Sequence, residues 1–191
     1  MILLLETIIA AFASIFTENL VLLRGLGSST MIMASRSKKQ LMGVSLCITY
    51  FSTICSVIIY FIDKFLQIDI QKGYAPLIFT ATVGCVYSLT LFVLIFASPK
   101  LFARLKNYIH LSAYNCSVIG CLMINTADNE TFWEYLNFGF FSGIGFLVSA
   151  YMLKIAYRRL NSENIPPSFR GYPAMLIYIG ILSMAIYGFV S

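Results

Sequence analysis

The chain has 191 residues, of which 59% are hydrophobic and only 11% are charged, and its mean hydropathy is +0.84. This composition excludes a typical soluble domain and predicts a membrane protein in which residues 1–191 form a single polytopic domain. The net charge of +5 indicates loops that face anionic lipid, not a nucleic-acid-binding surface.

Six apolar segments follow one another along the chain, each near the length of about 20 residues that crosses a bilayer as a helix. They are residues 2–23, 41–62, 75–97, 107–125, 132–154 and 172–190. The stretch 99–109 mixes basic and apolar residues. It predicts either a short amphipathic helix on the inner surface or an extension of the fourth segment. The expected fold is an all-α integral membrane protein with six transmembrane helices.

Polar residues interrupt the first and the fourth segments. The first loses its apolar character at residues 17–19 and is followed by a glycine- and serine-rich stretch at 25–30, and the fourth carries a polar run at 114–117. Interrupted segments in matching positions are typical of inverted repeats. The pattern predicts two inverted three-helix repeats, about 1–98 and 99–191, with helices 1 and 4 half broken.

Basic residues collect in the loops after the first, third and fifth segments. These loops contain Arg36, Lys38, Lys39, Lys100, Arg104, Lys106, Lys154, Arg158, Arg159 and Arg170, whereas the opposite loops contain only Lys64 and Lys72. Because basic loops stay in the cytoplasm, this asymmetry predicts that both termini lie outside it.

No Ser/His/Asp constellation and no phosphate-binding glycine loop is visible, so the candidate residues are the polar ones at membrane depth. They are Glu18, Asn19, Arg24, Ser28, Ser29, Asn115, Cys116 and Ser117. Asn115-Cys116 has two interpretations: helix packing by small and polar residues, or a ligand site in which the thiolate binds iron. Glu18, Asn19 and Asn115 are candidates for an ion path; alternatively Glu18 lies by a water-filled pocket and Arg24 extends towards the surface.

Four motifs spread along nearly the whole chain carry a resemblance. They are Asn19-Leu20-Val21-Leu22 with Arg24 and Gly27, Asn115-Cys116-Ser117-Val118-Ile119-Gly120, Gly139 to Gly145, and Ile165-Pro166-Pro167-Ser168-Phe169-Arg170-Gly171. Together they resemble the RnfA/NqrE family of six-span subunits. The resemblance implies an RsxA-like subunit of an Rnf-type ferredoxin:NAD oxidoreductase in a prokaryotic inner membrane. In such a complex, electron transfer is coupled to Na⁺ or H⁺ transport.

The resemblance also implies a homologous partner of inverted topology, RnfE or NqrD. The two chains would share a [2Fe-2S] cluster, with two cysteines from each. Cys116 matches one ligand position, but Ser29 and Thr30 stand where the family has Cys-Pro. Three explanations stay open: Ser29 ligates iron through oxygen, Cys121 replaces the missing cysteine, or the cluster is incomplete. The alternative function is a redox-inactive relative that acts as a small ion or solute transporter or as a structural subunit.

Overall fold

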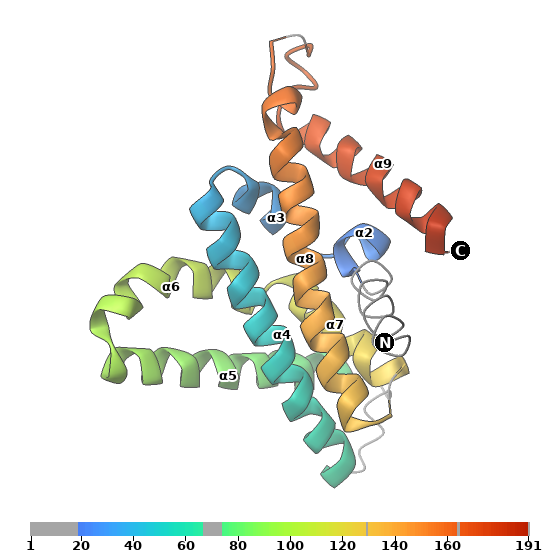
Figure 1. The fold of residues 1–191 in the computed structure, drawn as a ribbon. Coiled ribbons are helices and arrows are strands. Elements are labelled where there is room, and N and C mark those ends of the chain that lie inside the picture. The colour runs from blue at the N-terminus through green and yellow to red at the C-terminus, as the bar shows by residue number, and fades with distance from the viewer. Residues whose placement is uncertain (1–18, 67–73, 129, 164, 191) are drawn as a thin grey trace, which may run out of the picture.

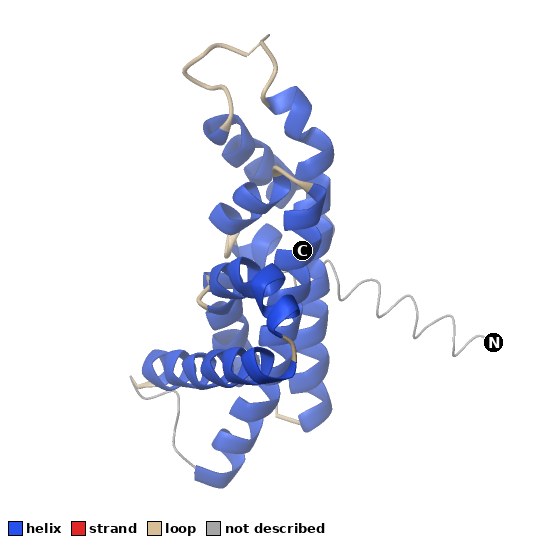
Figure 2. Cartoon of the chain, turned by 90° about the vertical axis from the view of Figure 1, so that its left-hand side faces the viewer, coloured by secondary structure: helices blue, strands red, loops and turns tan. Residues whose placement is uncertain are grey.

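The computed structural model describes residues 19–66, 74–128, 130–163 and 165–190. In these residues the chain is helical and contains no strand, which confirms the predicted all-α fold (Figure 2). The helices in chain order are α2 (Leu20–Arg24), α3 (Ser28–Ser35), α4 (Lys38–Leu66), α5 (Ala75–Ala97), α6 (Pro99–Ala113), α7 (Cys116–Asp128), α8 (Phe132–Leu160) and α9 (Tyr172–Val190).

Three of the described helices, α4, α5 and α8, are long and apolar enough to cross a membrane. Two shorter apolar helices cover residues 116–128 and 172–188. Most of the first predicted segment falls on residues 1–18, which lie outside the described residues. The protein therefore has the helices of a membrane protein, and the count of six spans stays a prediction.

The predicted segments agree with the helices at most of their boundaries. Segments 41–62, 75–97, 132–154 and 172–190 fall within α4, α5, α8 and α9, respectively. The fourth segment, 107–125, is divided between α6 and α7. The stretch 99–109 is the beginning of α6, which continues without a break to Ala113. The stretch 99–109 is therefore continuous with the first part of the fourth segment, and its position relative to the membrane surface stays a prediction.

The two 29-residue helices, α4 and α8, pack side by side in opposite directions at the centre of the molecule (Figure 1). Ser52 Oγ in the middle of α4 donates a hydrogen bond to the Gly139 carbonyl oxygen of α8 at 3.0 Å. Lys154 Nζ near the end of α8 donates to the Arg36 carbonyl oxygen, just before α4, at 2.8 Å. The start of α4 therefore lies beside the end of α8.

Glycines on α8 allow this close contact. A Cβ on Gly143 would lie 2.5 Å from Thr49 Cα, and a Cβ on Gly139 would lie 2.9 Å from the Ser52 carbonyl oxygen. Membrane helices have little hydrophobic driving force between them, so small residues that let their backbones approach contribute much of the packing. Gly139 and Gly143 are four residues apart and share one face of α8.

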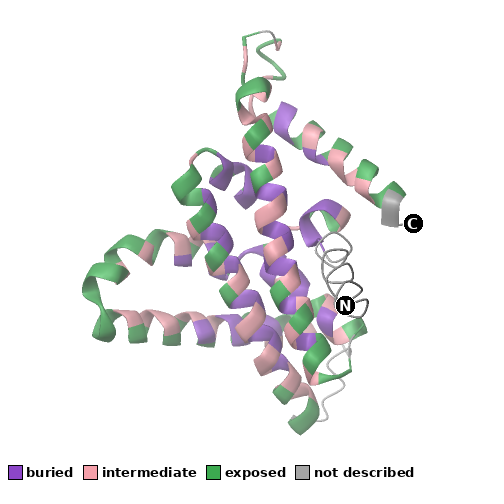
Figure 3. Cartoon of the chain, in the orientation of Figure 1, coloured by how far each residue is buried: buried purple, intermediate pink, exposed green. Residues whose placement is uncertain are grey.

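The outer helices are much more exposed than the central pair (Figure 3). In Figures 1 and 2, α5 lies across the direction of α4 and α8, and α6 returns from its far end towards the centre. Large apolar side chains of α5 are exposed, among them Leu77, Leu89, Phe92 and Phe96. Several large exposed apolar side chains on one helix are typical of helices that face lipid or another protein chain.

The order of helices occurs twice along the chain. Two short helices, α2 and α3, precede α4, and the divided helices α6 and α7 precede α8. The 29-residue helices that follow the two breaks run in opposite directions (Figure 1). This order is consistent with two inverted repeats, and both the repeats and their boundaries stay a prediction.

Candidate functional site

The first helix break lies at Gly25-Leu26-Gly27, between α2 and α3. Gly25 ends α2 with a φ of 70°, and Gly27 precedes α3 with a φ of 81°. These left-handed values favour glycine because a Cβ would approach the neighbouring carbonyl oxygen. The glycine-rich stretch that follows the first apolar segment therefore forms the break itself.

The second break lies at Tyr114-Asn115, between α6 and α7. Asn115 Oδ1 accepts a hydrogen bond from the Ser117 N–H at 3.1 Å, so this asparagine caps the first turn of α7. Its exposed fraction is only 3%, and its Nδ2 has no hydrogen-bond partner among the described residues. One side of the Asn115 amide thus holds the helix start, and the other side is free to donate.

The two breaks meet in one place, although almost ninety residues separate them along the chain. The Gly27 N–H donates a hydrogen bond to Cys116 Sγ at 3.0 Å. A Cβ on Gly27 would lie 3.0 Å from Ser117 Cβ and 3.1 Å from Asn115 Oδ1. We call residues 25–27 and 115–117 together the junction.

The junction gathers the N-terminal ends of two helices. α3 begins at Ser28 and α7 begins at Cys116, so the first N–H groups of both helices lie at or beside the junction. These groups have no partner within their helix and carry partial positive charge. The arrangement therefore favours a negatively charged group at the junction, such as a thiolate or a ligand anion.

The structure places the two predicted ligand residues on the accessible side of the junction. Cys116 and Ser29 are both exposed, and Ser29 lies in the first turn of α3, two residues after Gly27. Cys121 differs, because it is fully buried and lies about 140° around α7 from Cys116. Cys121 therefore does not share the accessible face of Cys116.

Of the predicted ion-path residues, the structure describes Asn19 and Asn115. Asn19 is fully buried and caps α2, because its Oδ1 accepts from Val21 N–H and Leu22 N–H. Its Nδ2 donates to the Gly145 carbonyl oxygen at 2.9 Å and to Ser149 Oγ at 2.7 Å. Asn19 therefore fastens α2 to α8.

A cavity of about 220 Å³ lies beside Asn19, and Arg24 and Asp128 also line it. Asn115 lies at the junction instead, and Glu18 lies outside the described residues.

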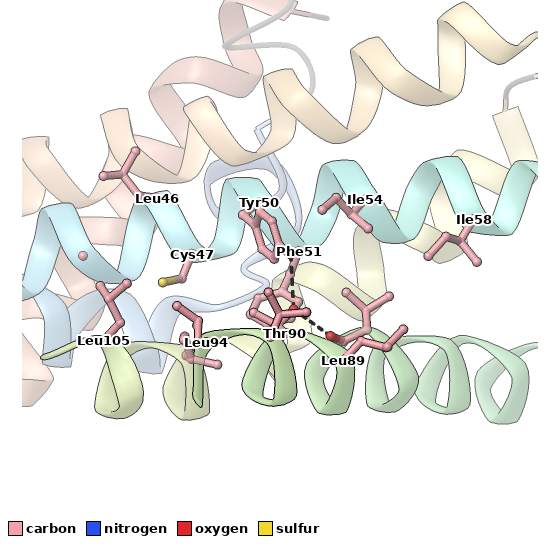
Figure 4. Close-up of a pocket in the computed structure, with 14 residues that line it drawn as sticks. Leu46, Cys47, Tyr50, Phe51, Ile54, Ile58, Leu89, Thr90, Leu94 and Leu105 are labelled. Carbon is pink, nitrogen blue, oxygen red and sulfur yellow. Dashed lines mark hydrogen bonds between the residues drawn. The ribbon is translucent and has the colours of Figure 1, made fainter. Parts of the chain in front are cut away.

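A larger groove between α4, α5 and α6 has a volume of about 590 Å³ (Figure 4). Its walls are almost entirely apolar, as Leu46, Ile54 and Leu94 show in the close-up. One polar contact crosses it, between Tyr50 Oη and Thr90 Oγ1 at 3.2 Å. The groove offers no set of groups for chemistry, so the junction is the candidate site.

Two glycine contacts at or beside the junction are not predictable from the sequence. In the sequence, Gly27 is noticeable only as a member of a motif. In the fold, its N–H donates the hydrogen bond to Cys116 Sγ. Gly120 lies directly under Leu26, so that a Cβ on Gly120 would collide with Leu26 Cδ1. The signal available in the sequence is glycine at both polar interruptions, because glycine inside a span often marks close approach of another backbone.

The donor set of the junction can be compared with the needs of a [2Fe-2S] cluster. Such clusters are normally held by four thiolates, and a cluster shared equally between two chains needs two from each. The junction supplies the thiol of Cys116, and the hydroxyl of Ser29 belongs to the first turn of α3, two residues after Gly27. In the described part of the chain no group of three or more His, Cys, Asp and Glu side chains could hold a metal ion. Because the junction supplies one thiol where an equally shared all-cysteine cluster needs two, the residues present do not fit such a cluster.

Comparisons with known proteins find similarity along almost the whole chain. A family model described as "Rnf-Nqr subunit, membrane protein" matches residues 7–191. A protein of Shewanella sediminis that is named as a subunit of an ion-translocating oxidoreductase complex is 26% identical over 187 residues, which cover 97% of each chain. Proteins of the same name from Vibrio vulnificus and Pseudoalteromonas translucida are 25% and 26% identical over the same share of both chains.

Proposed function

The chain belongs to the Rnf-Nqr family of membrane subunits, and on this premise we propose that it is the RnfA-type subunit of an ion-translocating oxidoreductase complex. In this proposal the complex is of the Rnf type, in which electron transfer between ferredoxin and NAD is coupled to Na⁺ or H⁺ transport. The nucleotide and flavin sites belong to other subunits, and this chain acts as a membrane-embedded part of the complex.

The junction is the observation that carries this proposal. Two helix breaks bring a glycine N–H within 3.0 Å of a cysteine sulfur, inside a chain whose relatives are named as subunits of such complexes. Broken helices at membrane depth are typical of sites where substrates or ions cross, because free backbone groups there can bind them.

We infer that the partner at the junction is a homologous subunit of inverted topology, similar to RnfE or NqrD. The exposed positions of Cys116 and Ser29 support this inference, because both side chains are accessible to a second chain. The charge asymmetry of the loops supports an orientation with both termini outside the cytoplasm. The bacterial relatives support a multi-pass placement in a prokaryotic inner membrane.

Two side chains at or beside the junction could supply a ligand atom to a cofactor. Cys116 is the one thiolate that the junction offers to a [2Fe-2S] cluster shared with the partner, and the Ser29 hydroxyl is the neighbouring oxygen donor. Because the junction lacks a second thiolate, it does not complete this chain's half of an all-cysteine cluster.

The serine at position 29 also favours a second function. With serine at position 29, the chain is a redox-inactive structural subunit or a small ion or solute transporter, in which the polar groups of the junction line the path. The unpartnered Nδ2 of Asn115 supports this candidate, because a buried amide without a partner is free to bind a ligand.

Iron analysis separates the two functions. The complex is purified without oxygen, and its iron content and electron paramagnetic resonance spectrum are compared with those of Cys116→Ala. The first function with a shared cluster predicts that Cys116→Ala loses about two irons per complex and one set of resonances, because one ligand is removed. The matched variant Cys85→Ala, at an exposed position on α5, keeps both. Identical iron content in the wild type and Cys116→Ala would remove the cluster and leave the second function.

A further inference from the structure

A strongly basic hollow lies at the end of the molecule where α4 begins and α8 ends. Its volume is about 650 Å³, and it is bounded by the turn before α4 and by the last turns of α8. The charged and polar residues that line it are Arg36, Ser37, Lys38, Lys154 and Arg158. We call this space the basic hollow.

Four cations line the basic hollow. None of the described residues that line it is Asp or Glu. Lys154 is held in place, because its Nζ donates to the Arg36 carbonyl oxygen at 2.8 Å and lies 5.5 Å from the centre of the Tyr157 ring. The start of α4 at Lys38 adds the partial positive charge of a helix N-terminus. The hollow therefore has an excess of positive charge that favours an anionic ligand.

The surroundings of the hollow show which kind of anion fits. Tyr151 and Ile155 also line it, and their exposed fractions are 55% and 67%. They lie on α8, a helix long and apolar enough to cross a membrane, where Tyr151 precedes both cations of the helix and Ile155 lies between Lys154 and Arg158. A site with cations at the helix ends and exposed apolar groups beside them matches a lipid, with its charged headgroup and its acyl chain.

We propose that the basic hollow binds the phosphate headgroup of an anionic phospholipid, whose acyl chain lies over Tyr151 and Ile155. The loop charges predict that this end of α4 and α8 faces the cytoplasm. The cytoplasmic leaflet is the one that carries anionic phospholipid. The bound lipid links the turn that follows α3 to the end of α8, and so supports the segment that leads to the first helix break. This proposal does not depend on the proposed function.

The test uses the purified complex after removal of lipid, titrated with fluorescent phosphatidylglycerol and, separately, with fluorescent phosphatidylcholine. The wild type is expected to bind phosphatidylglycerol more tightly. The variant Arg36→Gln/Lys38→Gln/Arg158→Gln is expected to lose on the order of tenfold or more of this affinity, because each cation near the headgroup contributes. The matched control Lys100→Gln/Arg104→Gln/Lys106→Gln removes the same charge from α6, outside the hollow, and is expected to keep the affinity.

Two further arms identify the ligand. Inorganic phosphate and glycerol phosphate at equal concentration are expected to displace the lipid poorly, because they lack the acyl chain. Displacement by either one as effective as by unlabelled lipid would overturn the lipid assignment. The proposal also fails if the wild type binds both lipids equally, or if the α6 variant loses as much affinity as the hollow variant. Unchanged lipid binding with loss of a neighbouring protein chain from the hollow variant would identify a protein-docking surface instead.

Discussion

Alanine at position 27 is expected to open the junction and to reduce the activity of the assembled complex. The φ of 81° at Gly27 disfavours any residue with a Cβ, and the new methyl group would meet Ser117 Cβ at 3.0 Å and Asn115 Oδ1 at 3.1 Å. We expect a destabilisation of about 2–4 kcal/mol from the sum of backbone strain and overpacking. Because groups at a working site tolerate little displacement, we also expect a loss of activity on the order of tenfold or more.

Gly25→Ala provides a matched control for this substitution. Gly25 has a similar φ of 70°, but a Cβ there would have no neighbour within 4 Å. It therefore carries the backbone strain alone, and we expect it to cost only about 1–2 kcal/mol and to leave most of the activity. Melting temperature and ion translocation in proteoliposomes measure the two effects. Equal behaviour of the two variants would show that the contact between the breaks has no functional weight.

A second large effect is expected where α4 and α8 cross. Gly143→Ala would bring a methyl group to 2.5 Å from Thr49 Cα, and backbone cannot move aside as a side chain does. The two central helices must separate, and we expect a destabilisation of about 2–3 kcal/mol, within the range seen for overpacked interiors. The melting temperature of the purified protein in detergent should fall clearly.

Gly180→Ala on α9 is the matched control for Gly143→Ala. A Cβ on Gly180 would have no neighbour within 4 Å, so alanine there is expected to be neutral or to stabilise the helix by up to about 1 kcal/mol. A melting temperature of Gly143→Ala equal to that of Gly180→Ala would contradict the close antiparallel contact of α4 and α8.

Much of the fold could be predicted from the sequence because apolar length and polar interruption are local signals. The segments 75–97 and 172–190 coincide with α5 and α9, since a bilayer-length apolar run leaves little choice of helix ends. The interruptions at Gly25–Gly27 and at Asn115 form breaks for local reasons as well. Glycine accepts a positive φ, and asparagine caps a helix start.

The contacts between distant segments could not be predicted in this way. The sequence predicts Asn19 as an ion-path residue, but its Nδ2 reaches Gly145 and Ser149, about 130 residues away, and this bonding is invisible in a single sequence. The same holds for the contact between Gly27 and Cys116. Periodicity and composition indicate which residues are polar at membrane depth, whereas the fold decides which of them meet.

We propose that the junction of the two helix breaks is the working part of this protein within an ion-translocating oxidoreductase complex. Ion translocation by the reconstituted complex with Cys116→Ala tests it most directly, with Cys85→Ala as the exposed-cysteine control. The prediction is an assembled complex that has lost translocation by about tenfold or more, while Cys85→Ala keeps the wild-type rate. An assembled Cys116→Ala complex that translocates ions at the wild-type rate would contradict it.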